Sequence, residues 1–354
     1  MKKHQTDKIR QFIIDSIANN KGNVSSLVAE KYGISRQAVN LHLQNMVNEG
    51  ILIAKGKTRN KEYAFKTFVS KKFKYSMADE ALRNKVTNSY DENRVWLERI
   101  RPLIKDISKN TLEICHYGFT EMLNNVFDHS EATELMIAVE FNVKQISITL
   151  VDNGVGIFDK IQKELGLEDH LQAILELAKG KLTTDPQHHT GEGIFFSTRM
   201  FDTFYIESGI LRFVHTGAGK DWLVEEPDTK IKGTGVIMRI DPKSERTCKE
   251  VFSKFSTELE EYGFTKTKVP VALARYGDEN LISRSQAKRL LTRFDRFKHV
   301  VLDFSNVESI GPAFADEIFR VFTRQHPDIK LSCVNTTDDV QKMIRRATNH
   351  VNAK

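Results

Sequence analysis

The sequence predicts a multidomain α/β protein, and three observations support this. The chain has 354 residues, more than a single hydrophobic core usually organises. Its charge is uneven, because residues 1–75 carry 15 Lys and Arg against 5 Asp and Glu, whereas the remainder carries 38 against 42. The hydrophobic pattern also changes, from helical spacing near the N-terminus to alternating strands and helices after Lys268.

The composition is that of an ordinary globular protein, with 40% hydrophobic and 28% charged residues. No apolar run approaches the roughly 18–20 residues that a membrane span needs, and no signal peptide opens the sequence. Cys115, Cys248 and Cys333 are far apart and form no C-x-x-C pair, which argues against a disulfide scaffold or a thiolate zinc site. We therefore expect a cytoplasmic protein that does not associate with membranes.

The basic N-terminal segment, residues 1–70, predicts a small helical domain with two strands. We expect helices over 6–18, 24–32 and 35–50, and strands over 51–54 and 62–66. Gly33 is a natural left-handed stop, Ser35 a natural N-cap, and Gly50 ends the third helix. The net charge of +10 over residues 1–75 favours a polyanion as partner, the alternative being a solvated basic surface.

Three helices followed by a basic two-stranded hairpin resemble the winged helix-turn-helix of bacterial transcription regulators. The resemblance implies that the third helix enters the major groove of double-stranded DNA and that the hairpin contacts phosphates. It places the following residues on DNA: Ser35, Arg36, Gln37, Asn40, Lys55, Lys57, Arg59 and Lys61. A winged helix that only docks another protein is the alternative. A homodimer is the natural state of such regulators.

Residues 71–110 predict a helical connector, which Pro102 interrupts. A long helix then runs from Thr111 to Ser130 and carries a core stripe beside a polar line. The polar line comprises Gly118, Glu121, Asn125, Asp128 and His129. Such a line is either a solvent-facing surface or the wall of a binding site.

Further polar and glycine-rich motifs follow this helix. Asp152 ends a strand on its apolar face, where a carboxylate is costly to bury without a donor. The segments Asn153–Gly156, Thr190–Ile194 and Gly233–Gly235 place glycines where a ligand could approach the backbone closely. The second of these opens an apolar helix, whose first N–H groups are free to bind an anion.

Taken in this order, the motifs resemble the N, G1, G2 and G3 boxes of the GHKL ATPases, the group that includes histidine kinases, gyrase and Hsp90. The stretch from Glu121 to His129 is most similar to that of anti-sigma-factor kinases. The resemblance implies an α/β sandwich over residues 111–245, with a mixed sheet and helices on one face. It also implies ATP and Mg²⁺ as cofactors and a lid over residues 158–190.

The resemblance assigns a role to each matching residue. Asn125 would ligate Mg²⁺, Glu121 would act as general base, and Asp152 would accept a hydrogen bond from the adenine amino group. The expected nucleotide contacts are Asn125, His129, Asp152, Gly154, Gly156, Lys181, Thr190, Gly191, Gly193 and Thr234. No phosphorelay histidine precedes the motif, and Glu192 stands between the second pair of glycines. We therefore expect slow hydrolysis or none.

Residues 268–350 alternate strands and helices, which predicts a small α/β domain with a parallel pair of strands. The stretch from Val300 to Ala315 resembles the STAS fold of anti-sigma-factor antagonists. In those proteins, a serine at the head of the second helix is phosphorylated. Here that helix begins Gly311-Pro312-Ala313, without a hydroxyl, so we expect a domain that is purely structural or docks a protein partner.

The leading hypothesis from the sequence is an ATP- and Mg²⁺-binding transcription regulator whose contact with DNA depends on the nucleotide. One alternative is a protein serine/threonine kinase of the anti-sigma type that acts on a STAS domain. Another is an ATPase switch in a defence or chaperone-like assembly, with the winged helix used for docking.

Overall fold

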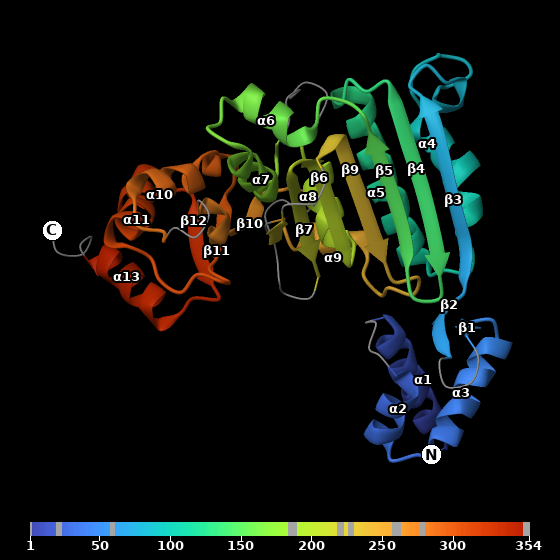
Figure 1. The fold of residues 1–354 in the computed structure, drawn as a ribbon. Coiled ribbons are helices and arrows are strands. Elements are labelled where there is room, and N and C mark those ends of the chain that lie inside the picture. Colours follow the sequence, from blue (N-terminus) through green and yellow to red (C-terminus); the bar gives the residue numbers. More distant parts are fainter. Residues whose placement is uncertain are drawn as a thin grey trace. The chain divides into compact units, whose positions relative to one another are not determined.

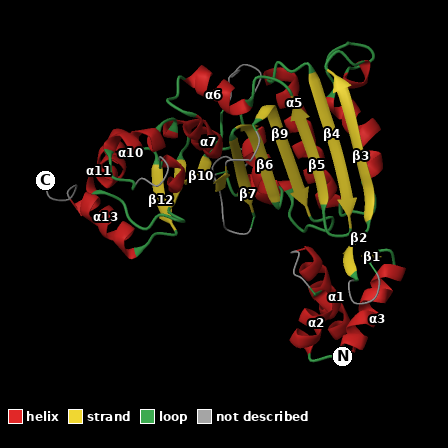
Figure 2. Ribbon diagram, viewed as in Figure 1, coloured by secondary structure: helices red, strands yellow, loops and turns green. Residues whose placement is uncertain are grey.

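The computed structural model describes residues 2–18, 23–56, 61–182, 190–217, 223–225, 230–256, 263–275 and 280–349. Its contacts divide the chain into two compact units. One unit comprises residues 1–72 with 138–147, and the other comprises residues 73–137 with 148–354. Figure 1 shows the course of the chain and Figure 2 shows its helices and strands.

Three helices and an antiparallel pair of strands form the N-terminal part of the chain. They are α1 (Lys2–Ala18), α2 (Val24–Tyr32), α3 (Arg36–Asn48), β1 (Leu52–Lys55) and β2 (Glu62–Phe65). Ser35 caps α3 as expected, because its Oγ accepts a hydrogen bond from the amide of Ala38 at 3.1 Å. Gly33 ends α2 in the left-handed region, with φ of +61°. The buried side chains of these elements form one core: Ile9, Ile13, Ile17, Val28, Val39, Leu43, Met46 and Leu52.

A seven-stranded sheet follows, with the strand order β3-β4-β5-β9-β6-β7-β8. Its strands are β3 (Thr67–Ser76), β4 (Glu134–Asn142), β5 (Ile146–Asp152), β6 (Thr203–Gly209), β7 (Leu211–Thr216), β8 (Leu223–Glu225) and β9 (Ile231–Ile240). β6 pairs antiparallel with both β7 and β9. Because β5 and β9 are neighbours, the end of β5 and the start of β9 can serve one site.

The strand β3 corrects the expected boundary between the N-terminal segment and a helical connector. Residues 71–76, which we expected to begin that connector, continue β3 instead. Val69, Phe73 and Tyr75 are less exposed than the residues between them and are separated by even numbers of positions, so they share one face of the strand, on which Lys71 is exposed. Three lysines between these apolar positions hid this pattern in the sequence.

Helices pack behind the sheet in the view of Figure 1. They include α4 (Glu92–Val95), α5 (Lys109–His129), α8 (Gly193–Met200) and α9 (Cys248–Ser253), while α6 (Ile157–Leu165) and α7 (His170–Lys179) lie between β5 and α8 in the chain. The helical run after α4 ends at Leu103 with Pro102 in its last turn, as the sequence predicted. The buried face of α5 includes Cys115, Phe119 and Met122.

The C-terminal part of the second unit is a three-stranded parallel sheet with helices. The strands β10 (Lys266–Pro270), β11 (His299–Asp303) and β12 (Lys330–Val334) pair in that order. The helices are α10 (Arg284–Leu291), α11 (Pro312–Asp316), which continues through a helical segment to α12 (Thr323–Gln325), and α13 (Asp338–Asn349). The alternation predicted from Lys268 onward is therefore present, with the first strand beginning two residues earlier.

We predict that Gly118→Ala destabilises the second unit. Gly118 is buried in α5, and a Cβ there would lie 2.4 Å from Cε2 of Phe201. Overpacking of this kind typically costs about 1–3 kcal/mol, which exceeds the roughly 1 kcal/mol that alanine gains over glycine in a helix. Urea denaturation should show the loss, and Glu113→Ala on the exposed side of α5 is the control. Equal stability of the two variants would contradict this prediction.

Candidate functional site

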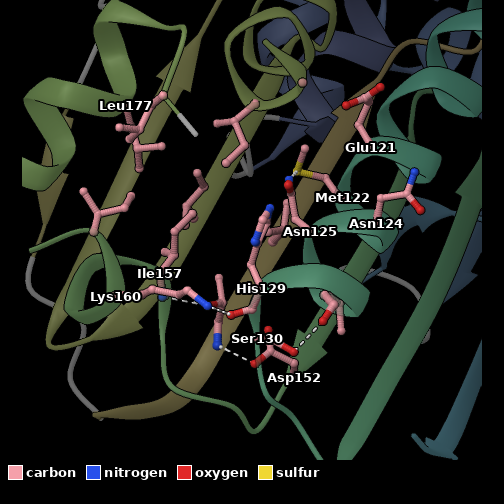
Figure 3. A pocket seen from close by; sticks show the side chains of 18 of the residues that line it. Glu121, Met122, Asn124, Asn125, His129, Ser130, Asp152, Ile157, Lys160 and Leu177 are labelled. Carbon is pink, nitrogen blue, oxygen red and sulfur yellow. Dashed lines mark hydrogen bonds between the residues drawn. The ribbon is translucent and has the colours of Figure 1, made fainter. Parts of the chain in front are cut away.

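A cavity of about 320 Å³ lies in the second unit, between α5, the sheet and the segments around α6, α7 and α8. Its apolar wall includes Leu150, Ile157, Ile161, Leu177, Leu182 and Ile206. Polar side chains enter it from α5 and from the end of β5, and Figure 3 shows Glu121 and Asp152 at opposite ends. An apolar cavity with a few convergent polar groups is the usual form of a small-molecule site.

The helix α5 supplies one polar wall of this cavity. Glu121, Asn125 and His129 are spaced four residues apart, so they lie on one helix face, and all three line the cavity. Asn124 lines it as well, although the sequence did not single it out. The polar line predicted from the sequence is therefore divided, because Gly118 packs on Phe201 and Asp128 is exposed and outside the cavity lining.

Asp152 forms the polar floor at the other end. Its side chain is buried, and Oδ1 accepts hydrogen bonds from the amides of Gly154 at 2.8 Å and Thr234 at 3.3 Å. Burial raises the pKa of this carboxyl above its usual range, and the two amides partly oppose that shift. A carboxylate in this setting can accept a further hydrogen bond from the amino group of a ligand.

The two glycines after Asp152 have different surroundings. Gly154 packs closely against the backbone, whereas Gly156 lines the cavity. A Cβ on Gly154 would lie 2.0 Å from the carbonyl oxygen of Ser130, and Gly154 is outside the cavity lining. Gly156 lines the cavity with φ of +83°, a value that favours glycine. The next amide, of Ile157, donates to Oγ1 of Thr234 at 3.0 Å, which joins the start of α6 to β9.

The end of the cavity opposite Asp152 combines carboxylates with a helix N-terminus. Gly193 begins α8, and a Cβ there would lie 2.0 Å from Oε2 of Glu121. Thr190, Gly191 and Glu192 complete this part of the lining. Burial raises the pKa of Glu192, and the charge of Lys181 partly opposes this. The side chain of the N-cap residue, Glu192, makes no capping hydrogen bond at the start of α8, and a helix N-terminus favours an anion.

The residues at this end fit Mg²⁺ only together with a ligand that brings its own oxygens. Glu121 and Asn125 offer the hard oxygen atoms that Mg²⁺ prefers. Among the described residues, however, no group of three or more His, Cys, Asp and Glu side chains could hold a metal ion. A metal here would need phosphate or similar oxygens to complete its coordination.

Lys181 does not take the position that the sequence assigned to it. It is outside the cavity lining, and its Nζ donates to the carbonyl of Arg296 at 3.1 Å. The same ammonium lies 5.2 Å from the ring centroid of Phe297 and 5.6 Å from that of Phe264. These aromatic faces and the carbonyl attract the ammonium, whose charge still acts on Glu192 in the cavity lining. The lid expected over 158–190 is described only up to Leu182, with Thr190 at its far end.

Lys160 is the cation that the sequence analysis missed. It lines the cavity from α6, and its Nζ donates to the carbonyl of His129 at 2.8 Å. It also lies 3.6 Å from Glu131 and 3.8 Å from Glu164. Its position one helical turn after Gly156 was the available signal, because the start of α6 faces the cavity.

The expected DNA-contacting residues lie on exposed parts of the first unit. Ser35, Arg36, Gln37 and Asn40 are exposed at the start of α3, and Oδ1 of Asn40 accepts from the hydroxyl of Ser25 at 3.2 Å. Two members of the basic hairpin, Lys55 and Lys61, are also exposed. The other two, Lys57 and Arg59, lie outside the described residues.

The head of α11 has no space for a side chain at its N-cap. A Cβ on Gly311 would lie 2.7 Å from Cα of Ile282, so this position has no room for the serine side chain that the resemblance would place near it. The nearby hydroxyl of Ser305 donates to Asp303 at 2.8 Å and accepts from Asn335 at 3.0 Å. These contacts give Ser305 a structural role at the end of β11.

Comparison with known proteins identifies one part of the chain. The model of a STAS-like domain of unknown function (DUF4325) matches residues 286–341, so this stretch is a STAS-like domain. A search of the curated proteins found no match. Among the described residues, no helix has the length and apolar character needed to cross a membrane.

We predict that Asp152→Asn is at least as stable as the wild type at neutral pH. An Asn Oδ1 can accept from the same two amides, while the cost of burying a charge disappears. Because the folded-state pKa is raised, the wild type binds the proton more tightly when folded. Wild-type stability relative to the variant should therefore rise as the pH falls through that raised value.

Urea denaturation of the wild type and Asp152→Asn across pH 3.5–7.5 measures this difference. Asp202→Asn, a substitution at another carboxylate in the same unit, is the control, because 41% of the Asp202 side chain is exposed to water. A wild type that gains stability over Asp152→Asn as the pH rises would contradict the prediction.

Proposed function

We propose that this protein binds ATP with Mg²⁺ and that the bound nucleotide controls its contact with DNA. The observation that carries the proposal is the convergence of four separate motifs on one cavity. Its lining includes Glu121 to His129 of α5, Asp152 with Gly156, Thr190 to Gly193, and Thr234. These are the motifs in which the sequence resembles the GHKL ATPases.

The end near Asp152 suits an adenine base. The buried carboxylate would accept a hydrogen bond from the exocyclic amino group, and this bond would give the ligand-facing side of Asp152 a partner. Oγ1 of Thr234 accepts from Ile157, so its hydroxyl hydrogen can still be donated to a ring nitrogen. The apolar side chains of Leu150, Ile161 and Ile206 would pack on the base.

The opposite end suits a polyphosphate. The amides of Gly191 and Gly193 at the start of α8 would donate to phosphate oxygens. Mg²⁺ would neutralise charge on those oxygens, with Asn125 as the protein ligand. Glu121 lies directly against the start of α8, where its carboxylate could take a proton from a water molecule or a hydroxyl.

The first unit suits double-stranded DNA. The exposed start of α3 carries Arg36, Gln37 and Asn40, residue types that read base edges in the major groove. Lys55 and Lys61 flank the hairpin loop, where they would contact phosphates. The resemblance to winged helix-turn-helix regulators supports a dimer on a symmetric site.

A protein kinase of the anti-sigma type is the second candidate. The spacing of Glu121, Asn125 and His129 favours it, because all three line the cavity. The closed position at Gly311 argues against the chain's own STAS-like domain as substrate. A separate STAS protein would then be the phosphate acceptor.

We predict that Glu121→Ala keeps nucleotide binding and loses turnover. Removal of a general base should lower turnover about 10²-fold or more, while the base-recognising end is untouched. The experiment follows γ-labelled ATP with Mg²⁺ in the wild type, Glu121→Ala and Asp152→Asn. Label on protein would favour the kinase, free phosphate a slow ATPase, and label retained on bound ATP a switch. A wild type that binds no ATP, or Asp152→Asn that binds as tightly as wild type, would overturn the proposal.

We predict that DNA affinity differs by about fivefold or more between the complexes with a non-hydrolysable ATP analogue, with ADP and without nucleotide. Lys61→Ala should reduce the slope of log affinity against log salt by about one unit, because one phosphate contact is lost. Lys85→Ala, an exposed lysine outside the N-terminal unit, is the matched control. Identical affinities in all three nucleotide states would show that the ligand does not distinguish the two conformations.

A further inference from the structure

The segment from Glu176 to Leu182 comprises the end of α7 and the residues that follow it. Some of its residues line the cavity, and others contact the STAS-like part of the chain. Leu177 and Leu182 form part of the cavity wall. Glu176, Lys179 and Lys181 instead contact the C-terminal STAS-like part of the chain. One short segment therefore touches the candidate nucleotide site and the STAS-like domain at once.

Arg293 is the centre of the contact on the STAS-like side. Its Nη1 donates to Oε2 of Glu176 at 2.8 Å, and its Nη2 donates to the carbonyls of Gly180, at 3.1 Å, and Lys181. Only 11% of the arginine side chain is exposed. A guanidinium group presents its donors in a rigid planar fork, so one side chain fixes the carboxylate and two successive carbonyls together.

Lys179 adds a second set of bonds across the same contact. Its buried ammonium donates to Oε1 of Glu176 at 2.6 Å and to the carbonyl of Thr292 at 2.9 Å. It also donates at 3.2 Å to the carbonyl of Arg289 near the C-terminal end of α10, where helix carbonyls lack partners and favour a cation. Burial lowers the pKa of Lys179, and the charge of Glu176 opposes this.

This arrangement holds two parts of the chain together at a high cost in desolvation free energy. Two cations and one carboxylate are removed from water, and apolar side chains of similar volume would often hold such a contact at least as well. What apolar side chains cannot do is fix the direction of the carbonyls of Gly180 and Lys181. The contact therefore suits a role in geometry better than a role in stability alone.

The carbonyls that Arg293 holds, those of Gly180 and Lys181, lie within two residues of Leu182 in the cavity wall. Leu182 directly follows the two bonded carbonyls, and its amide donates to the carbonyl of Gly191 at 3.2 Å. Gly191 has φ of +70°, and a Cβ there would lie 2.4 Å from the backbone of Leu182. The position of Leu182 therefore sets the position of Gly191, which begins the proposed phosphate-binding end.

We propose that Arg293 is a positioning residue through which the STAS-like domain controls the phosphate end of the nucleotide site. The proposal rests on the proposed nucleotide function and names the regulation of that site. Whatever shifts the STAS-like domain, a bound protein partner included, would act on ATP through the carbonyls that Arg293 holds. By linkage, ATP must strengthen the Arg293 contact as much as that contact strengthens ATP binding.

The test compares Arg293→Met, Arg293→Lys and the control Arg320→Met in the full chain. Arg320 lies in the same domain and pairs with Asp316, away from the 176–182 segment. Calorimetric titration gives the Kd for ATP·Mg²⁺ and for adenosine, which lacks phosphates. We expect Arg293→Met to weaken ATP binding about tenfold and adenosine binding less than about twofold. Arg293→Lys should recover part of the loss, and Arg320→Met should match the wild type.

A second measurement separates positioning from unfolding. In the wild type, ATP should slow hydrogen exchange at the amide of Leu182, and Arg293→Met should remove that protection. Should Arg293→Met fail to fold, Arg293→Lys carries the same ratio test, since it keeps the positive charge and loses the fork.

An unchanged ratio of the two Kd values in the Arg293 variants, with the wild type binding ATP, would overturn this inference alone. An equal loss of ATP and adenosine affinity would also overturn it, because the arginine would then serve only the fold. A wild type that binds neither ligand would overturn the proposed function and this inference together.

Discussion

The candidate site depends on the bonds that one buried carboxylate makes. Oδ1 of Asp152 accepts from the amides of Gly154 and Thr234, so the end of β5 and the start of β9 are held by the same atom. The close approach of these segments leaves no room for side chains: a Cβ on Gly233 would lie 2.2 Å from the carbonyl oxygen of Asp152. Gly154 and Gly233, from two motifs far apart in the sequence, are therefore both needed where the backbone packs closely around Asp152.

Much of the site could be predicted because it depends on local patterns. The four-residue spacing of Glu121, Asn125 and His129 places them on one face of a helix whatever the rest of the fold does, and all three line the cavity. Asp152 could be singled out for a similar reason, because it is a carboxylate that ends a strand on the apolar face of that strand. The alternation of strands and helices after Lys268 predicted a small α/β domain for the same reason. Its STAS-like character came from the resemblance of the stretch from Val300 to Ala315, and a family model matches residues 286–341.

The parts that sequence could not predict depend on contacts between distant segments. Lys181 looked like a phosphate ligand from its neighbours in the chain, but its partners Phe264, Phe297 and Arg296 come more than 80 residues later. Lys160 lacks a motif of its own and has as its one sequence signal a position one helical turn after Gly156, while the packing of α6 brings it to the carbonyl of His129. The strand β3 was missed because Lys71 interrupts the apolar positions of its two-residue period, while Lys72 and Lys74 lie between them.

Buried charge occurs at both ends of the region that surrounds the cavity, and the two cases have different physical meanings. Asp152 is buried in the cavity lining, and under the proposed function a hydrogen bond from the ligand would offset part of the cost of burying its charge. Glu176, Lys179 and Arg293 bond to one another and to four backbone carbonyls, so most of the cost of burying their charges is offset without any ligand, although Nε of Arg293 has no partner among the described residues. The first arrangement leaves a buried carboxylate in the cavity lining. The second joins the segment from Glu176 to Leu182, which includes two residues of the cavity wall, to Arg293 and to the carbonyls of Arg289 and Thr292 in the STAS-like part of the chain.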